Sequence, residues 1–428
     1  MKPVDVKKSL EEAIDALVQD PTPYLYHPDK DFTRNRKLCF KTVIEMLIGM
    51  GSGSLSKEIF EWINYAEDTV SVSAFVQQRS KIKYDALNFI FKTIVSRCDR
   101  HQMFNGYRLL AIDGSDLRLP TNKADTFSFI RNDENTKGYN LLHLDVLYDS
   151  LQHVYVDASI QSKIGMNEHK ALVTMIDRSD ISDKVIIIAD RGYESFNNIA
   201  HCQEKGWYYI IRSKESYGIK YTTPDTDTFD IDTIITLTRR QTKETKTLIQ
   251  KNPERYRWIQ PHTTFDYIHS GENKMYDLPI RIVRFKISDT LSETILTNLP
   301  QDDFSPQTIK ELYKMRWKIE TSFKELKYNI GLASIHSKKQ NLILQEIYAK
   351  LTIYNALAMI TYAQNVPGDK RINFARAVNV CIRFITGKLS EDALLKMLSK
   401  FLSPIRPGRI FPRKVTIKNS LSFAYRLP

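Results

Sequence analysis

Cysteine motifs are absent from this 428-residue sequence. Its four cysteines lie far apart, and no two of them form a Cys-x-x-Cys pair: Cys39, Cys98, Cys202 and Cys381. This spacing excludes a disulfide framework and a cysteine-ligated zinc site. We therefore expect four reduced cysteines in the core of a cytoplasmic protein.

Long hydrophobic runs are missing as well. The most apolar segment, residues 347–363, is interrupted by Lys350 and Asn355, so it predicts a core helix and no membrane span. Acidic residues interrupt the apolar periodicity of the N-terminal stretch "MKPVDVKKSLEEAIDALV", which excludes a secretory signal peptide. Internal repeats and low-complexity tracts are also absent.

Acidic residues are outnumbered by basic ones. Lys and Arg total 62 against 50 Asp and Glu, which gives a formal net charge of +12. This excess favours a polyanionic partner, most often nucleic acid, although it is a weak signal by itself. The hydrophobic content of 42% is ample for buried cores, and the length predicts two to four domains.

Both ends of the chain are basic. Residues 1–104 have helical periodicity and include the basic stretches "FTRNRKLCFK" and "FVQQRSKIK". These stretches are either solvated helix faces or parts of a helical domain that binds DNA phosphates. The basic C-terminal region, residues 371–428, has no acid after Asp392, and it is either a solvated terminus or an arm that follows DNA.

Strand patterns begin at residue 105. Up to residue 213 the order is three strands in a meander, then helix, strand, helix and strand. Asn167 is the expected N-cap of the first of these helices. The order predicts an α/β fold with a mixed sheet and helices on both faces. Residues 214–304 predict a mainly β segment, and helical periodicity returns over residues 305–370.

Two aspartates follow apolar strands of this predicted sheet. Asp113 follows "LLAI" and Asp190 follows "VIIIA", and a glycine comes soon after each. Either aspartate alone could be an ordinary turn residue. Together, at the ends of two strands of one sheet, they could share a divalent cation such as Mg²⁺. Asp116 is a less well placed rival to Asp113.

A third acid lies in the stretch "YKMRWKIETSFKELK". Four polar residues share an arc of about 60° on a helical wheel with roughly 3.6 residues per turn: Tyr313, Arg316, Glu320 and Lys327. Apolar residues fill the neighbouring arc, which predicts that Glu320 lies between the core and a cleft. The alternative is a solvated face, because Arg316 and Glu320 have the i, i+4 spacing of a surface ion pair. The span from Tyr313 to Lys327 is about 21 Å at about 1.5 Å per residue, a length that suits a DNA strand.

Three segments resemble the catalytic boxes of cut-and-paste DDE transposases of the IS4 group, relatives of the Tn5 and Tn10 transposases. These are "AIDGSDLRLP", "ADRGYES" and the spacing Y-x2-R-x3-E-x6-K, which the four residues named above match without a gap. The resemblance extends over roughly residues 30–365. It implies an RNase H-like fold in which a mainly β insertion, here residues 214–304, precedes the glutamate-bearing helix.

The resemblance also implies how the site works. Asp113, Asp190 and Glu320 would bind two Mg²⁺ ions, or Mn²⁺ in their place, and Tyr313, Arg316 and Lys327 would contact DNA near the cleavage site. The partners of the protein would be double-stranded transposon ends and target DNA, bound by a homodimer. Its location would be the prokaryotic cytoplasm, at the nucleoid. Relatives flip a base onto an aromatic side chain.

More than one interpretation is open for several residues and for the function. Trp258 is a candidate for stacking on a flipped base or else a core tryptophan of the insertion. Asn167, Glu168 and Lys170 are further candidates for the cleft. The rival functions are an RNase H-like nuclease without strand transfer and a domesticated DNA-binding protein without catalysis. The complete set of three acids argues against the second rival.

Overall fold

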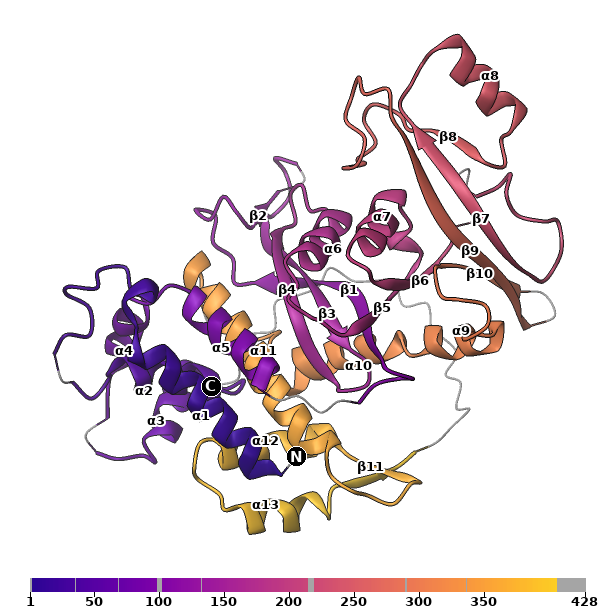
Figure 1. Cartoon of the computed structure of the whole chain (residues 1–428). Helices are drawn as coiled ribbons and strands as arrows, with labels where there is room; N and C mark the ends of the chain where they lie inside the picture. Colours follow the sequence, from indigo (N-terminus) through magenta and orange to yellow (C-terminus); the bar gives the residue numbers. More distant parts are fainter. Residues whose placement is uncertain are drawn as a thin grey trace.

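The computed structural model describes residues 2–34, 36–67, 69–97, 102–131, 133–214, 219–288, 291–335 and 337–405. Among these residues, no helix is long and apolar enough to cross a membrane. A large mixed sheet forms the centre of the molecule, with helices against both of its faces (Figure 1).

The sheet has the strand order of an RNase H-like fold. Its central strands run in the order β4-β3-β1-β5-β6, with β3 antiparallel to β1 and β4, and with β5 and β6 parallel to β1. The bounds of these strands are β1 Tyr107–Leu119, β3 Tyr139–Asp149, β4 Val154–Ser162, β5 Lys184–Ala189 and β6 Tyr208–Arg212. The short strand β2 (Phe129–Ile130) pairs with the start of β3. The predicted α/β class and order of elements are confirmed.

Helices cover the two faces of this sheet with separate cores. On one face, α6 (Glu168–Asp177) and α7 (Phe196–Glu204) bury Leu110 and Ile112 of β1. On the other face, α10 (Trp317–Lys324) and α11 (Gln340–Tyr362) share a core with Ala111 and Leu117. Alternate residues of β1 therefore face different helices, as the period of two along a strand requires.

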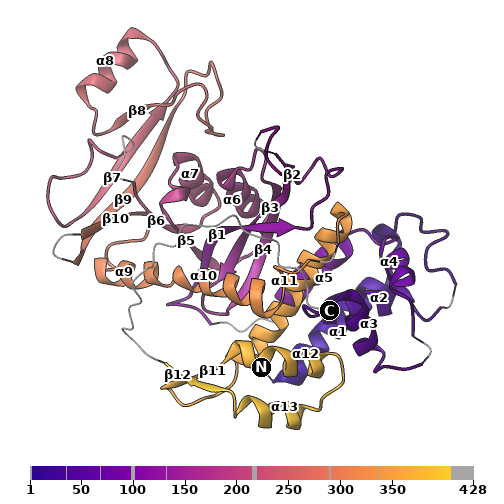
Figure 2. The same ribbon diagram turned by 180° about the vertical axis from the view of Figure 1, so that it is seen from behind.

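The segment before the glutamate-bearing helix extends the sheet. Strand β10 pairs antiparallel with β6, and the order continues through β9 and β7 to β8. The elements of this insertion are β7 Phe229–Thr238, α8 Lys243–Lys251, β8 Tyr256–Trp258, β9 Met275–Ser288 and β10 Leu291–Thr297. The helix α8 is an addition to the mainly β pattern expected from the sequence. Figure 2 shows this part projecting from the end of the central sheet.

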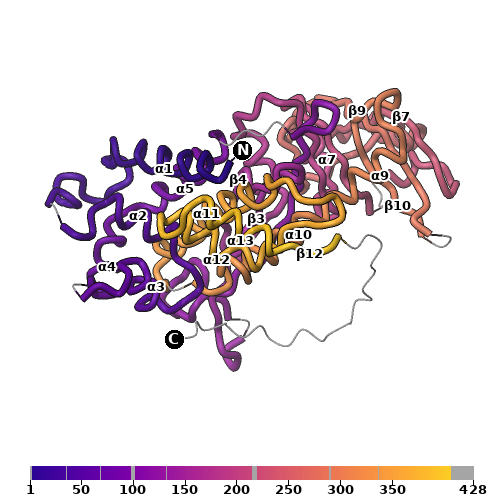
Figure 3. Tube along the Cα trace, turned by 90° about the horizontal axis from the view of Figure 1, so that it is seen from below, coloured from indigo at the N-terminus to yellow at the C-terminus, as the bar shows by residue number. Residues whose placement is uncertain are grey.

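The N-terminal region is helical, as expected, and it packs on α11. Its elements are α1 Pro3–Gln19, η1 Thr22–Tyr24, α2 Phe40–Gly49, α3 Leu55–Trp62, α4 Val72–Arg79 and α5 Asp85–Arg97. Their buried residues belong to the same core cluster as α11 and one face of the sheet. Figure 3 shows α11 beside α2 and α5.

The two polar residues that interrupt the most apolar segment have specific partners. Lys350 donates from Nζ to the carbonyl oxygens of Met50 and Gly51, and the Asn355 amide exchanges hydrogen bonds with the backbone of Tyr155. Because their hydrogen bonds are satisfied, both side chains can lie inside the core of a helix that is buried nearly all round.

The C-terminal region contains β11 (Lys370–Ile372), α12 (Phe374–Ile385), α13 (Glu391–Leu398) and β12 (Leu402–Pro404). The basic residues from Arg406 onward lie outside the described residues.

The expectation of four core cysteines is wrong for one position. Cys202 and Cys381 are buried, but Cys39 is exposed because it is the N-cap of α2, where its Sγ lies 3.1 Å from Thr42 Oγ1. Cys98 lies outside the described residues.

Candidate active site

Asp113 lies within a strand and not at the end of one, which corrects the expectation from the sequence. The parallel pairing of β1 with β5 stops at the pair Ala111 and Ile188, where β5 is about to end. Strand β1 continues to Leu119 because β3 still pairs with it. Asp113 therefore lies just past the point where its parallel neighbour is lost, on the face of the sheet that α10 and α11 cover.

Asp190 follows β5 directly, as predicted. Its Oδ1 accepts a 2.7 Å hydrogen bond from the Gly192 backbone N–H and so caps the short 3₁₀ turn Arg191–Tyr193. A Cβ at position 192 would lie 2.8 Å from that oxygen, so the glycine gives the carboxylate room to fold over the turn. The buried apolar strand and the capped turn together hold Asp190 at the edge of β5.

The segment with Glu320 is not one straight helix. The helix α9 (Pro306–Lys314) ends before Arg316, α10 follows, and a π-helical turn covers Glu325–Asn329. Between α9 and α10 the hydrogen bonds shorten to i−3, as from the Arg316 N–H to the Tyr313 carbonyl at 3.1 Å. The wheel of about 100° per residue is therefore only approximate over this segment.

Asp113 lies close enough to Asp190 and Glu320 to be affected by the charges of both. Burial raises the pKa of Asp113 to about 6, and the negative charges of Asp190 and Glu320 add to that rise. A hydrogen bond from the Gly114 backbone and the charge of Arg316 oppose it. The structure therefore brings all three sequence-predicted acids together, with Arg316 among them.

Arg316 is the cation at the centre of this group. Its side chain is 10% exposed, and its Nη1 lies 3.1 Å from Oε1 of Glu320, whose side chain is 29% exposed. The guanidinium also lies over the rings of Tyr313 and Trp317, at 5.9 and 5.0 Å from their centroids. Burial lowers the pKa of Arg316, but Tyr313 and the surrounding acids raise it overall, so the cation stays charged.

Tyr313 and Lys327 have partners within the protein. Tyr313 is 6% exposed and belongs to the core between α9 and the sheet. Lys327 donates from Nζ to Ser115 Oγ and to the Asp116 carbonyl, both at 2.7 Å. These bonds tie the π-helical turn to β1 just beyond Asp113.

Trp258 lies at the wall of a pocket whose lining does not include the three acids. It is 37% exposed, so it is not the fully buried tryptophan of the alternative reading. The pocket has a volume of about 930 Å³ and lies between the insertion and the helices α6 and α7. Asn167, Lys170 and Lys214 line it together with Trp258. Asn167 is also the N-cap of α6, as expected from the sequence.

Asp116, the rival to Asp113, points to the opposite face of β1. There its Oδ1 lies 2.6 Å from His143 Nδ1 and accepts a 2.9 Å hydrogen bond from Lys163 Nζ. Burial alone would raise the pKa of Asp116, but these two partners lower it overall. Asp113 is therefore the aspartate of β1 that lies with Asp190 and Glu320.

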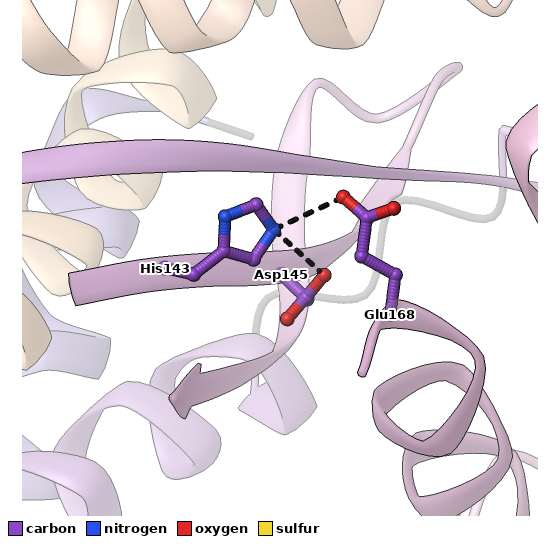
Figure 4. A group of neighbouring side chains, drawn as sticks. All are labelled: His143, Asp145 and Glu168. Carbon is purple, nitrogen blue, oxygen red and sulfur yellow. Dashed lines mark ion pairs between the residues drawn. The ribbon is translucent and has the colours of Figure 1, made fainter. Parts of the chain in front are cut away.

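A second polar cluster was missed by the sequence reasoning. His143 and Asp145 of β3 meet Glu168, the first residue of α6 (Figure 4). His143 Nε2 lies 3.3 Å from Asp145 Oδ1 and 3.1 Å from Glu168 Oε1. The available signal was the i, i+2 spacing of His143 and Asp145 in an otherwise apolar strand, which places both on one face.

The electrostatics of the two clusters differ. Burial lowers the pKa of His143, but the nearby carboxylates of Asp145, Glu168 and Asp116 outweigh that effect and raise it to about 10. The group of Asp113, Asp190 and Glu320 offers only carboxylate oxygens, the ligands that Mg²⁺ prefers. The negative charges of Asp190 and Glu320 repel that of Asp113, and a bound dication would offset this repulsion. These residues therefore fit a magnesium site.

The chain matches one protein-family model, described as Transposase DDE domain, over residues 104–356, more than half of its length. Two relatives from Escherichia coli are the putative transposase InsL for insertion sequence element IS186A, of strain K12, and the transposase for insertion sequence element IS421. Each is 37% identical over 57 residues, which are 13% of this chain and 15% of the relative. The chain thus matches these relatives over less than a fifth of their length.

Among solved structures, the cryo-EM structure of a piggyBac transposase synaptic complex with hairpin DNA is similar over 95% of this chain and 86% of that chain. The sequence identity is 11% and the TM-score is 0.45. The matched family region, by contrast, contains Asp113, Asp190 and Glu320 and all the central strands of the sheet. The chain therefore belongs to the DDE transposase family.

Proposed function

We propose that the chain is a cut-and-paste DNA transposase. It binds the terminal inverted repeats of its element, cleaves the transposon ends and transfers their 3′-OH groups to target DNA. Its active site consists of Asp113, Asp190 and Glu320, which hold two Mg²⁺ ions, with Mn²⁺ as a substitute. Family membership supports the class of reaction, and the site residues rest on their geometry.

The observation that best supports this site is the electrostatic effect of Asp190 and Glu320 on Asp113. They come from β1, from the end of β5 and from α10, and yet Asp190 and Glu320 both raise the pKa of Asp113. Separate turn acids or a solvated helix face would not meet in this way. Convergence of carboxylates from distant segments is characteristic of functional sites.

The protein groups have distinct tasks in this proposal. Asp113, Asp190 and Glu320 would hold two divalent ions, which would supply activation of the attacking water or 3′-hydroxyl and stabilisation of the leaving oxygen at phosphorus. Arg316, held between Glu320 and two aromatic rings, places a positive charge where a phosphate next to the acids would lie. Lys327 holds the π-helical turn to β1 and adds positive charge beside the DNA. Tyr313 lies beside the Arg316 guanidinium and supports its position from the core.

DNA contacts outside the triad follow from charge and aromatic exposure. Trp258 is half-exposed in a pocket with Lys170 and Lys214, so it can stack on an unpaired base while the lysines contact the backbone. The N-terminal helices, residues 1–104, bind the terminal repeats, and a homodimer brings two ends together. The net charge of +12 favours such contacts with DNA phosphates.

Replacing Glu320 by Ala tests the site. The Glu320→Ala chain should lose at least about 1,000-fold in cleavage of duplexes carrying the element's terminal sequences, a barrier increase of about 4 kcal/mol. Binding to the same duplexes should stay within a few fold. The matched control is Glu311→Ala, an exposed glutamate of α9 whose Oε1 accepts a hydrogen bond from Gln307. Cleavage by Glu320→Ala at the rate of the control would contradict the assignment.

Strand transfer separates this function from its nearest rival. A transposase should join pre-cleaved terminal duplexes to a plasmid, and Glu320→Ala should abolish that joining along with cleavage. A nuclease without strand transfer would cleave but leave the pre-cleaved ends unjoined. A domesticated DNA-binding protein would bind the ends and do neither.

A further inference from the structure

The cluster of His143, Asp145 and Glu168 has no task in the proposed reaction. His143 and Asp145 lie on the face of the sheet that α6 covers, opposite to the face of Asp113. Both are buried, at 4% and 0% exposure, whereas the Glu168 side chain is 36% exposed. A buried polar cluster of this kind needs a physical explanation, because burial of unpaired charge is costly.

Two carboxylates converge on one nitrogen in this cluster. Asp145 Oδ1 and Glu168 Oε1 lie 3.3 and 3.1 Å from the same atom, His143 Nε2 (Figure 4). A protonated Nε2 has a single N–H, which can point at only one of them. Nε2 and Oδ1 are both buried, and neither makes a well-aligned hydrogen bond within the described residues.

Another histidine of the chain shows the usual arrangement. His201 also lies between two acids, but it uses a different ring nitrogen for each. Its Nδ1 is 2.9 Å from Asp177 and its Nε2 is 2.9 Å from Asp266. One N–H on each ring nitrogen is enough to pair His201 with both of its acids. One N–H on His143 Nε2 cannot pair with two carboxylates at once.

The spacing of the three atoms suits ligands of one ion. His143, Asp145 and Glu168 each offer one ligand atom, and these three atoms lie within 4.8 Å of one another. Nitrogen and oxygen ligands of Zn²⁺ lie at about 2.0 to 2.2 Å from the metal, so neighbouring ligands of a tetrahedral ion are about 3.4 Å apart. The two separations from Nε2 are already close to that value.

The surrounding residues are those that orient metal ligands. His143 Nδ1 lies 2.6 Å from Asp116 Oδ1, which leaves Nε2 free to present its lone pair when Nδ1 holds the proton. Gln161 donates to Asp145 Oδ2 at 2.7 Å, which turns the other oxygen toward Nε2. Lys163 in turn donates to Asp116 at 2.9 Å.

The charges of these groups also favour a dication. With a protonated imidazole and Lys163, the three carboxylates of Asp116, Asp145 and Glu168 retain one uncompensated negative charge. A divalent ion beside a neutral imidazole leaves none. The imidazole nitrogen selects for ions of the zinc class over Mg²⁺, which prefers oxygen ligands alone.

We propose that His143 Nε2, Asp145 Oδ1 and Glu168 Oε1 form a binding site for one Zn²⁺-class ion, separate from the catalytic acids, with a fourth position open to water. The ion would join the start of α6 to β3 on the far side of the sheet from Asp113. The absence of a side chain at Gly114 leaves room for His143, because a Cβ there would lie 2.3 Å from His143 Nε2.

The test uses the full chain with the catalytic acids replaced, Asp113→Asn, Asp190→Asn and Glu320→Gln, so that they cannot bind the probe. After treatment with a chelator, Zn²⁺ is titrated by calorimetry in excess Mg²⁺. We expect one Zn²⁺ per chain, and at least a tenfold loss of affinity when His143→Gln or Glu168→Gln is added. His201→Gln is the matched control and should leave the affinity unchanged.

Two results would overturn the proposal. One is a parent chain that binds no Zn²⁺ in the presence of Mg²⁺, which would leave a protonated His143 as the explanation of the cluster. The other is unchanged Zn²⁺ affinity in Glu168→Gln, a variant that should fold because this side chain is partly exposed. Neither result bears on DNA cleavage by the unsubstituted chain.

Discussion

The ion pair between Arg79 and Glu346 should be a strong link between the N-terminal helices and α11. Arg79, at the end of α4, is 1% exposed and Glu346 is 5% exposed. Arg79 donates to Glu346 Oε1 at 3.1 Å, to Gln345 Oε1 at 3.2 Å and to the Leu342 carbonyl at 2.9 Å. Replacing Arg79 by Met removes all three of these hydrogen bonds. The Glu346 carboxylate stays buried but loses its cationic partner.

The cost follows from that burial. Removing one partner of a buried ion pair destabilises a protein by about 3 to 5 kcal/mol, because the other charge stays out of water. We therefore expect Arg79→Met to lower the free energy of unfolding by about 3 to 5 kcal/mol. The double variant Arg79→Met, Glu346→Leu removes both charges and should be at least about 2 kcal/mol more stable than the sum of the single losses predicts.

Urea unfolding measures these values, with far-UV circular dichroism and tryptophan fluorescence as coincident probes. A matched control is Lys41→Met, which breaks the exposed ion pair to Asp15 and should cost at most about 1 kcal/mol. The reasoning is refuted if Arg79→Met costs no more than Lys41→Met. It is also refuted if the losses of the two single variants add up to that of the double variant.

Three further changes have expected outcomes. Gly114→Ala should lower the free energy of unfolding by about 1 to 3 kcal/mol in thermal or urea melts, since the added Cβ would lie 2.3 Å from His143 Nε2; a melt like that of the parent would contradict the close approach. Trp258→Ala should weaken binding of DNA with unpaired bases by at least about tenfold, about 1.4 kcal/mol, in fluorescence anisotropy, while fully paired DNA is bound almost as before. Burial raises the pKa of Glu325 above its usual value, so its ionisation opposes folding as the pH rises through that range. Glu325→Gln should therefore raise the melting temperature relative to the parent at pH 8 and not at pH 4, where both side chains are neutral, and an equal change at the two pH values would refute this.

The location of Asp190 was predictable because its evidence is local. Residues 185–189 of β5 are apolar and buried on both faces, so the strand had to end where the first charged residue appears. Asp113 follows an equally apolar run, but β1 continues past it because β3 supplies partners that lie 21 to 33 positions further along the chain. Pairing of β1 with β3 is a contact between residues far apart in the sequence, and local periodicity does not reveal it.

In the segment with Glu320, too, some features follow from local sequence and others depend on tertiary contacts. The spacing of Tyr313, Arg316, Glu320 and Lys327 follows from local sequence, and in the structure the Glu320 side chain is 29% exposed on a helix whose Ile319 and Phe323 are buried. The break between α9 and α10 and the burial of Tyr313 depend on what the sheet offers opposite each residue. A helical wheel has no information about that opposite surface.

The sequence by itself determined the class of the fold, the order of its strands and helices, and the three acids that the family boxes mark. Each of these depends on periodicity or spacing within about fifteen residues, where the geometry of a strand or a helix dictates the pattern. Only the tertiary structure decided that Asp113 and Asp116 face opposite sides of the sheet into different clusters, and that His143, Asp145 and Glu168 meet. Those facts depend on strand register and on the docking of α6, and both are set by the packing of the whole core.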